Sequence, residues 1–310
     1  IQLTVERLLP IVEEEDIFIS TNKDYIDFVR EQLPGIPKEN ILYEPVGRNT
    51  APCVGLGAFH ISKKYKDAIM YVLPSDHQIK FGKMFADTLK DAADVAEEGH
   101  NLVTIGITPD YPETGYGYIK FDPQSENKRA YKVDRFVEKP GLDLAKEYIN
   151  TEEYLWNSGM FTWKVSSILE NIKQFMPDTY NGLEKISGAI GTDKYDEVLT
   201  KEFTEIKSES VDYGIMEKAN DIYIIPGTFG WDDVGSWLAL ERLQKSNDFG
   251  NVVSGDVISV STRDCIIQGE KKLIATVGIE NTIIVDSDDA ILICNKDNAG
   301  EIKKIIENLK

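Results

Sequence analysis

The sequence has 310 residues, enough for a sizeable core and usually for two domains. Its hydrophobic share of 42% and charged share of 28% are those of a compact globular protein, which excludes disordered, collagen-like and coiled-coil classes. The formal net charge of -19 disfavours binding to nucleic acid or to an anionic membrane, because an acidic surface repels phosphate. An anionic ligand would therefore need a locally basic pocket or a divalent metal ion.

The cysteines Cys53, Cys265 and Cys294 are widely spaced and form no C-x-x-C pair. This spacing predicts neither a disulfide framework nor a zinc site, and it favours the reducing environment of the cytoplasm. No apolar run approaches the length of a membrane span. Residues 1–10 have neither the basic start nor the cleavage site of a signal peptide, and we expect them to be helical.

Short apolar runs rich in strand-forming residues alternate with amphipathic stretches through the first part of the chain. The predicted elements are residues 17–20, 24–33, 51–64, 68–73, 81–98 and 102–107. Their rhythm predicts a mostly parallel sheet covered by helices. Because residues 68–73 form a continuous apolar run, we expect a central strand that is buried on both faces.

Turn-forming sequences in the middle of the chain predict an antiparallel extension and hence a mixed sheet. After Leu243 the pattern changes to short strands at residues 252–260, 265–268, 273–277, 282–285 and 290–294, closed by a helix at 302–309. These strands predict a small β-rich domain, either a β-helix or a sandwich. We place the boundary near residues 247–250, which gives domains of residues 1–247 and 248–310.

Asp76 follows the predicted central strand in the sequence Pro74-Ser75-Asp76-His77. Ligands of open α/β sheets collect beyond the carboxyl ends of the strands, which makes Asp76 a candidate metal ligand. A turn in which Asp76 caps backbone amides is the alternative, and these residues alone do not decide between the two. The few scattered histidines do not suit a zinc site, so His77 is predicted to support Asp76 instead.

Asp233 has a similar setting in the sequence Trp231-Asp232-Asp233-Val234-Gly235, after a predicted strand at residues 222–225. Mg²⁺ favours one or two carboxylates and completes its shell with water and substrate phosphates, as a nucleotidyl transfer needs. Two aspartates at strand ends can share one such ion. The alternative is that Trp231 and Trp237 are core anchors and that Asp233 caps the next helix.

The segment 48–52 reads as the start of a helix that Asn49 or Thr50 caps. Exposed amides at a helix start can contact a base or a phosphate. Capping accounts for Thr50, but it does not account for the donors and acceptors of Glu44, Arg48 and Asn49 clustered beside it.

Three further segments combine close backbone approach, charge, amide groups and aromatic surface. They are Gly115-Tyr116-Gly117-Tyr118, Glu138-Lys139-Pro140 and Trp156-Asn157-Ser158-Gly159. Each alone is more often a tight turn, an exposed ion pair or a satisfied core polar group. Their joint occurrence favours a site for a sugar phosphate.

Other nucleotide-binding signatures are missing from the sequence. Gly55-Leu56-Gly57 and Gly115-Tyr116-Gly117 both lack the third glycine of a dinucleotide fingerprint, and there is no P-loop. The sequence therefore disfavours a simple dehydrogenase or kinase.

Taken in order, six segments resemble those of bacterial mannose-1-phosphate guanylyltransferases, and the resemblance covers nearly the whole chain. They are Glu44-Pro45 to Asn49-Thr50-Ala51-Pro52, Leu73-Pro74-Ser75-Asp76-His77, Glu113-Thr114-Gly115-Tyr116-Gly117-Tyr118-Ile119, Phe136-Val137-Glu138-Lys139-Pro140, Trp156-Asn157-Ser158-Gly159-Met160-Phe161 and Trp231-Asp232-Asp233-Val234-Gly235. The set is highly specific, although each piece recurs among nucleotide-sugar pyrophosphorylases. The resemblance implies an α/β fold, with a Rossmann-like nucleotidyltransferase domain of mixed sheet followed by a small β-helix-like domain.

The resemblance also implies an activity, GTP plus mannose 1-phosphate giving GDP-mannose plus pyrophosphate, with Mg²⁺ as cofactor and with homodimerisation. Asp76 and Asp233 would bind the Mg²⁺ and act in catalysis. By the same resemblance, the guanine nucleotide would contact Glu44, Asn49, Thr50 and Ser75. The mannose phosphate would contact Gly117, Glu138, Lys139, Asn157 and Asp212.

The family opens with a strand, a glycine-rich loop that bears a basic residue and a Pro-Lys-Gln segment, none of which is among the 310 residues. That loop cradles the triphosphate and neutralises charge on the departing pyrophosphate. We therefore keep the hypotheses that this chain alone is inactive, or that it is a non-catalytic subunit that holds a sugar nucleotide. A sister pyrophosphorylase with another base or sugar is a third reading. The sequence also ends before the isomerase domain that some relatives append.

Overall fold

The structure is a computed structural model that describes residues 1–308. The chain forms two compact units. The first unit is Ile1–Trp231 and the second begins at Asp232. The predicted boundary after residue 247 falls later than this division. The reason is that Trp237, Leu238 and Leu240 pack against the core of the second unit.

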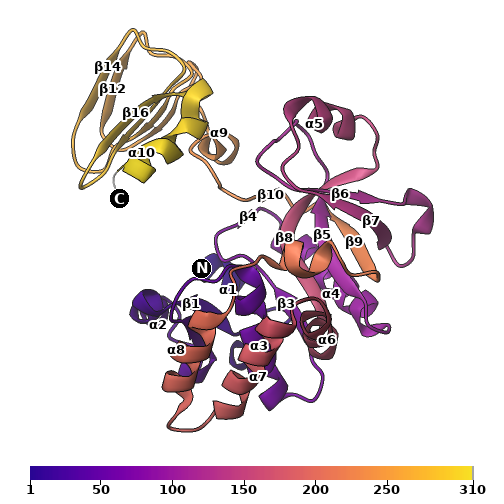
Figure 1. The fold of residues 1–310 in the computed structure, drawn as a ribbon. Coiled ribbons are helices and arrows are strands. Elements are labelled where there is room, and N and C mark those ends of the chain that lie inside the picture. Colours follow the sequence, from indigo (N-terminus) through magenta and orange to yellow (C-terminus); the bar gives the residue numbers. More distant parts are fainter. Residues whose placement is uncertain (309–310) are drawn as a thin grey trace. The chain divides into compact units, whose positions relative to one another are not determined.

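The first unit contains most of the helices and the large sheet (Figure 1). Its helices are α1 Gln2–Glu6, α2 Ile26–Gln32, α3 Thr50–Lys64, α4 Gly82–Glu97, α5 Leu142–Ile149, α6 Val165–Phe175, α7 Pro177–Ala189 and α8 Tyr195–Glu205. Its strands are β1 Ile19–Asn22, β2 Ile41–Glu44, β3 Ile69–Val72, β4 Gln78–Ile79, β5 Leu102–Ile107, β6 Tyr118–Phe121, β7 Tyr131–Val137, β8 Tyr154–Lys164 and β9 Ile222–Gly227, with β10 Trp231–Asp232 starting at its last residue.

The main sheet has six strands in the order β3-β8-β5-β9-β7-β6, and β6 also pairs with β8. The long strand β8 runs antiparallel to β3, β5 and β6. Of the pairings in this sheet only β5–β9 is parallel. The predicted mixed sheet is therefore confirmed, but the mostly parallel pairing is wrong, because β8 inserts between β3 and β5 and opposes both.

Strand β3 is also not the central strand that its apolar run predicts. It lies at the end of the strand order and its residues are half-buried. Both of its faces nevertheless contact apolar clusters, Met70 and Val72 on one side and Tyr71 on the other. Packing on two faces therefore produces the apolar run even at the edge of the sheet.

Helices cover both faces of the sheet. The side chains of β5 alternate, so that Leu102 joins a cluster with α3 and α6, while Val103 and Ile105 pack against α4. Helices α7 and α8 form a further layer against α3 (Figure 1). A layered α/β unit of this kind leaves the ends of its strands as the place where polar loops gather.

The second unit is a β-helix-like stack of short strands closed by helices. Its elements are α9 Ala239–Leu243, β11 Val252–Ser254, β12 Val257–Val260, β13 Ile266–Gln268, β14 Ile274–Val277, β15 Thr282–Asp286, β16 Ile291–Asn295 and α10 Ile302–Asn308. Strands β11, β13 and β15 pair in parallel, as do β12 and β14, which is the pairing of successive coils. The predicted last helix residue, Leu309, lies outside the described residues.

The sequence predicts one strand at residues 252–260, but the structure has two, β11 and β12. They are separated at Gly255, whose φ is +92°. A Cβ at this position would lie 2.3 Å from the backbone oxygen of Gly269 in the neighbouring coil. The corner therefore requires glycine, and it turns one apolar run into two sides of a coil.

Two expectations concern the chain as a whole. Within residues 1–308, no helix combines the length and the apolar character that crossing a membrane requires. Cys53, Cys265 and Cys294 are free thiols in the structure.

Candidate functional site

The loop after β3 carries Asp76. The side chain of Asp76 is exposed, and its carboxylate makes no hydrogen bond or ion pair within the described part of the chain. The loop backbone is held firmly instead, since Thr4 Oγ1 donates to the carbonyl of Ser75 at 2.9 Å and Arg7 Nη1 donates to the carbonyl of His77 at 3.1 Å. Asp76 is therefore not the backbone cap that the alternative reading supposes.

His77 supports this loop through its side chain as well. The indole Nε1 of Trp231 donates to Nδ1 of His77 at 3.0 Å, and the two rings meet edge to face. Trp231 also meets Tyr116 edge to face, at a centroid distance of 5.3 Å, and Tyr116 meets Trp156 at 5.2 Å. An aromatic row thus connects the loop of Asp76 to the segment that contains Asn157.

Asn157 is the centre of a second group of polar residues. Its backbone amide donates to the carbonyl of Gly117 at 2.8 Å, and its side-chain Nδ2 donates to Asp212 Oδ1 at 2.7 Å. A Cβ on Gly117 would lie 2.6 Å from Oε2 of Glu138. Lys139 Nζ lies 3.4 Å from Oε1 of Glu138. The structure thus brings together all five residues that the resemblance assigns to the sugar phosphate.

An irregularity in β8 aims Asn157 toward this group. On β5, Thr104 pairs with Phe161 while Gly106 pairs with Asn157, so that β8 carries extra residues between the two pairs. Gly159 takes up the bend with a φ of +68°. Bulges of this kind re-aim side chains and are common next to active sites.

The charges around Asn157 are mostly negative. Burial raises the pKa of Asp212, against the opposing effect of the hydrogen bond from Asn157. Burial also raises the pKa of Glu217, and the charges of Glu138 and Asp212 add to the effect. Ionised carboxylates can accept hydrogen bonds from sugar hydroxyls, and the Asn157 amide can both donate to and accept from them. Lys139 supplies a nearby positive charge for a phosphate.

The candidate nucleotide residues lie at the start of α3 and the end of β2. Asn49 has a φ of +66°, and its Oδ1 accepts from the amide of Thr50 at 2.8 Å. Thr50 Oγ1 in turn accepts from the amide of Val211 at 2.9 Å, which ties the start of α3 to the segment of Asp212. A left-handed asparagine is strained, and strained residues that the surrounding structure holds in place cluster at ligand sites.

Glu44 is the last residue of β2 and accepts a 3.4 Å hydrogen bond from Ser20. It lies next to the first turn of α3, where Cys53 is found. Burial, followed by the charge of Glu44, raises the pKa of Cys53 to about 12. Glu44, Asn49 and Thr50 therefore lie around one helix start, while Ser75 is exposed in the loop of Asp76.

Asp233 belongs to the second unit, in the irregular segment that connects β10 to α9. Its neighbour Asp232 forms a two-point ion pair with Arg242, with an Nε–Oδ2 distance of 2.5 Å and an Nη2–Oδ1 distance of 3.1 Å. Asp233 Oδ1 accepts from the amide of Gly235 at 3.0 Å. Because α9 begins only at Ala239, Asp233 is not its cap. Its sharing of a metal ion with Asp76 remains a prediction.

The donor chemistry of these aspartates fits Mg²⁺. Within the described residues there is no group of three or more His, Cys, Asp and Glu side chains that could hold a metal ion by itself. Mg²⁺ does not need one, since it takes one or two carboxylates and leaves the remaining positions to water and substrate phosphates. The exposed carboxylate of Asp76 suits such a shared shell.

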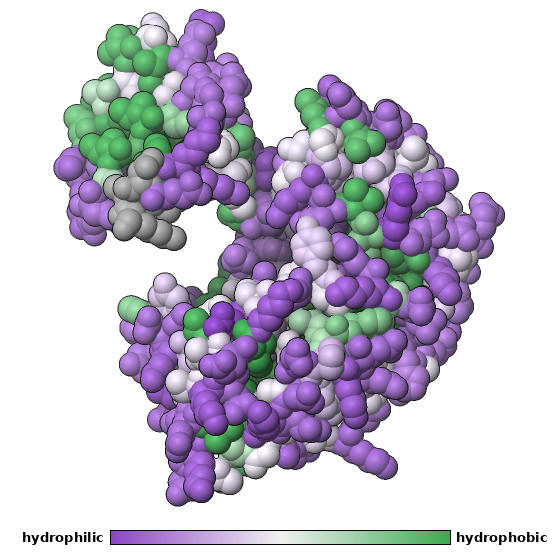
Figure 2. Space-filling view, viewed as in Figure 1, coloured by the Kyte–Doolittle hydropathy of each residue, from purple (hydrophilic) through white to green (hydrophobic). Residues whose placement is uncertain are grey.

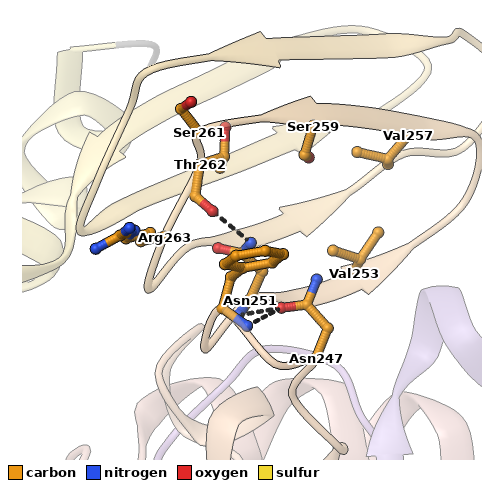
Figure 3. Close-up of a pocket in the computed structure, with 9 residues that line it drawn as sticks. Asn247, Asn251, Val253, Val257, Ser259, Ser261, Thr262 and Arg263 are labelled. Atoms are coloured by element: carbon orange, nitrogen blue, oxygen red, sulfur yellow. Dashed lines mark hydrogen bonds between the residues drawn. The ribbon is translucent and has the colours of Figure 1, made fainter.

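A groove of about 490 Å³ lies elsewhere, on the second unit (Figure 3). Asn251 joins successive coils, since its Nδ2 donates to the carbonyl of Thr262 at 2.9 Å, and Asn247 Oδ1 closes a local turn by accepting from the amides of Phe249 and Asn251 at 3.0 Å. The hydrogen bonds of these asparagines are thus used for folding, and none of the predicted site residues lines the groove.

Sequence reasoning missed the supports of the Asp76 loop. Thr4 and Arg7 lie about seventy residues before the carbonyl groups that they bind. A motif with short spacing cannot link positions so far apart in the sequence. Both acceptors are also main-chain carbonyls, which every residue has, so the residue types at these positions do not indicate the contacts. The contacts of Thr4 and Arg7 follow only from the packing of this segment within the first unit.

Comparison with known proteins gives a family for each part of the chain. The family described as Nucleotidyl transferase matches residues 1–248, and the family described as MannoseP isomerase/GMP-like beta-helix domain matches residues 255–309. The chain is 39% identical over 315 residues to the mannose-1-phosphate guanylyltransferase of Salmonella muenchen, and 38% identical over 319 residues to that of Escherichia coli K12. All of this chain is matched, and it spans 66% of the length of each relative.

Two solved structures resemble all or most of the chain. One is described as a mannose-1-phosphate geranyltransferase from Thermus thermophilus, with a TM-score of 0.89, 32% identity, and coverage of 99% of this chain and 88% of that one. The other is the mannose-6-phosphate isomerase from Helicobacter pylori, with a TM-score of 0.61, 26% identity, and coverage of 75% of this chain and 89% of that one.

The layered α/β unit with polar loops at its strand ends, followed by a β-helix, defines the class as a nucleotidyltransferase. Enzymes of this class generally use a divalent metal ion. With matches along its whole length, the chain belongs to the family of the mannose-1-phosphate guanylyltransferases.

Proposed function

We propose that this protein transfers a guanylyl group from GTP to mannose 1-phosphate and releases GDP-mannose and pyrophosphate. The single observation that carries the proposal is the group around Asn157, in which Gly117, Glu138, Lys139 and Asp212 meet within hydrogen-bonding or van der Waals reach. The names of the relatives that match the whole chain support the same reaction.

In this proposal the mannose 1-phosphate lies against the Asn157 group. Asn157 and the carboxylates of Glu138 and Asp212 orient the sugar hydroxyls, and Lys139 contacts the phosphate. The absence of a side chain at Gly117 leaves room for close approach of the ligand to the backbone. Charge-assisted hydrogen bonds of this type fix both position and orientation.

The guanine nucleotide contacts Glu44, Asn49, Thr50 and Ser75 in the same proposal. The hydrogen bond from Val211 to Thr50 supports it, because it joins the start of α3 to the residue before Asp212. The nucleotide and sugar-phosphate residues are therefore tied to each other by a short stretch of backbone. A shared anchor keeps two reactants at a fixed separation, which is a large part of catalysis by positioning.

The chemistry is an in-line displacement. An oxygen of mannose 1-phosphate attacks the α-phosphorus of GTP, the bond from that phosphorus to the bridging oxygen breaks, and pyrophosphate departs with the electron pair. Mg²⁺ held by Asp76 and Asp233 would neutralise charge on the phosphates. No covalent intermediate with the protein is required, so the role of its side chains is to bind and orient.

The proposal is tested by incubating the full-length protein with Mg²⁺ and a panel of nucleoside triphosphates and sugar 1-phosphates, followed by chromatography of the products. GDP-mannose as the preferred product supports it. Preference for another base or sugar would identify a sister pyrophosphorylase. Tight binding of GDP-mannose in calorimetry without any turnover would favour a non-catalytic subunit.

We also propose a cytoplasmic location and a homodimer. The free thiols of Cys53, Cys265 and Cys294 support a reducing compartment. Exposed apolar side chains on the second unit, Val277 and Ile293 among them, support association of copies.

A further inference from the structure

We propose that Thr4 of helix α1 and Arg7, the residue directly after that helix, are positioning residues for Asp76, acting through the backbone on either side of it. The proposal rests on the metal-binding role of Asp76 that is proposed above. Thr4 Oγ1 donates to the carbonyl of Ser75, directly before Asp76, and Arg7 Nη1 donates to the carbonyl of His77, directly after it. Neither side chain touches the reacting groups.

Helix α1 is a firm anchor for these two contacts. Val5 and Leu8 are buried in the same core cluster as Ile79, which follows the loop, and Met160 of β8. Burial of Thr4 and Val5 within α1, and of Leu8 just beyond it, therefore holds this segment in place, although so short a helix has little stability of its own. Side chains projecting from it lie in defined places.

The side chains of Thr4 and Arg7 both bind the loop that carries Asp76, and each is held in place. Thr4 is only 9% exposed, so its hydroxyl is largely removed from water and depends on the Ser75 carbonyl as its partner. Arg7 also donates through Nε to the carbonyl of Leu3 at 2.9 Å, which fixes the guanidinium plane. Burial lowers the pKa of Arg7, which indicates that the group is partly desolvated. A desolvated charged donor makes a stronger hydrogen bond than an exposed one.

The loop backbone around Asp76 is held by hydrogen bonds, but in the part of the chain that the structure describes the Asp76 side chain is not. The backbone is held on both sides of this residue, and the ring of His77 is held by Trp231, whereas the Asp76 carboxylate is exposed and makes no hydrogen bond or ion pair within the described residues. A ligand whose backbone is fixed in advance loses little freedom when it binds a cation. Thr4 and Arg7 thus preorganise the carboxylate for a divalent cation shared with substrate phosphates.

The test uses matched pairs of variants in the full-length protein. Thr4→Val keeps the branched shape and removes the donor, while Thr4→Ser keeps the donor. Arg7→Met removes the guanidinium, while Arg7→Lys keeps one charged donor. Arg30→Met, at an exposed site on α2 paired with Asp27, is the control for loss of an arginine.

The first measurement is the backbone order parameter of residues 75–77, from nuclear magnetic resonance relaxation of metal-free protein. Loss of one hydrogen bond to the loop backbone is expected to lower this order parameter from the roughly 0.85 of rigid backbone toward about 0.6 in Thr4→Val and Arg7→Met, with near wild-type values in Thr4→Ser and Arg30→Met. The second measurement is Mn²⁺ binding by electron paramagnetic resonance in the presence of GDP-mannose. We expect the dissociation constant to rise about fivefold in the same two variants and to recover in Thr4→Ser and, in part, in Arg7→Lys.

Several outcomes would overturn the proposal. It fails if the order parameters of residues 75–77 are unchanged, and it also fails if they fall while Mn²⁺ affinity stays that of the wild type, since the contacts would then be structural only. Failure of the proposed function looks different: Asp76→Asn would leave Mn²⁺ affinity unchanged, or the wild type would bind Mn²⁺ and substrates without turnover. Thermal unfolding of each variant separates these results from a general loss of fold.

Discussion

At the scale of single residues, the candidate site is organised around Asn157. Its backbone and side chain bind Gly117 and Asp212 at once, so that residues from distant parts of the sequence share one place. Lys139 is the positive member of a group with the carboxylates Glu138 and Asp212. The roles of these residues can be separated by substitution.

Lys139→Met is expected to raise the KM for mannose 1-phosphate about tenfold or more, because a charge-assisted hydrogen bond to phosphate contributes about 1.5–3 kcal/mol. The KM for GTP should change little. Lys132→Met, at an exposed position earlier on β7, is the control. Steady-state kinetics with each substrate varied in turn measures both values, and an equal rise in both would show that Lys139 does not act on the sugar phosphate.

Asp212→Asn tests the effect of burial on a carboxylate. Because the folded-state pKa of Asp212 is raised above the unfolded value, ionised Asp212 is destabilising at neutral pH, and this cost disappears as pH falls below the raised pKa. Asparagine can still accept the hydrogen bond from Asn157. The variant should therefore exceed the wild type in free energy of unfolding by more at pH 7.5 than at pH 4. Urea unfolding at the two pH values measures the difference, and a constant difference contradicts the account.

At the scale of secondary-structure elements, local patterns predict the elements better than their pairing. The apolar run at residues 102–107 gives β5 with the bounds that the structure has, and the helix predicted at 51–64 is α3, which begins one residue earlier. The position of β3 at the sheet edge and the insertion of β8 between β3 and β5 were not predictable. Both depend on antiparallel pairing between residues roughly fifty to ninety-five positions apart, and the period of the side chains is the same for either direction.

For the candidate site too, the residues could be predicted better than the contacts that join them. The resemblance names the five residues of the Asn157 group, and the structure brings them together, but their physical link through the β8 bulge was not predictable from spacing. The supports from α1 left no sequence signal because they bind backbone carbonyls. Gly255 shows the opposite case, since a glycine within an apolar run indicates a corner or bulge.

Helix packing provides a prediction on pH. His60 of α3 contacts Tyr195 of α8 at 2.8 Å, and burial lowers the pKa of His60 to about 4. The folded-state pKa is thus below the unfolded value of about 6.5, so the stabilisation from neutral His60 is full above that value and is lost as pH falls toward 4. The free energy of unfolding should fall from pH 7 to pH 4.5 more steeply in the wild type than in His60→Gln. His100→Gln, at an exposed site, is the matched control, and parallel curves for wild type and His60→Gln would contradict the account.

At the scale of the whole molecule, charge and apolar surface are distributed unevenly. The chain has a net charge of -19, yet the second unit displays hydrophobic surface (Figure 2). Val277 and Ile293 on that unit are 72% and 70% exposed. Two copies with the same strong charge associate most easily through surface that carries none, and exposed apolar patches often mark such contacts.

Ile293→Lys and Val277→Lys are therefore expected to shift the proposed homodimer toward monomer, because each places a charge within the apolar surface. Thr200→Lys, on α8 of the first unit, adds the same charge elsewhere and should not change association. Sedimentation equilibrium measures the dissociation constant. A wild-type protein that remains monomeric at high concentration would remove the dimer from the account.

The proposed reaction is a metal-assisted transfer in which Asp76 and Asp233 bind the cation. Its most direct test is pyrophosphate release by the full-length protein given GTP, mannose 1-phosphate and Mg²⁺, compared with Asp76→Asn and Asp233→Asn. We predict Mg²⁺-dependent release by the wild type and a loss of at least about a hundredfold in each folded variant, as expected when charge stabilisation in the transition state is removed. Wild-type rates in either variant, or no release by the intact wild-type protein, would contradict the central claim.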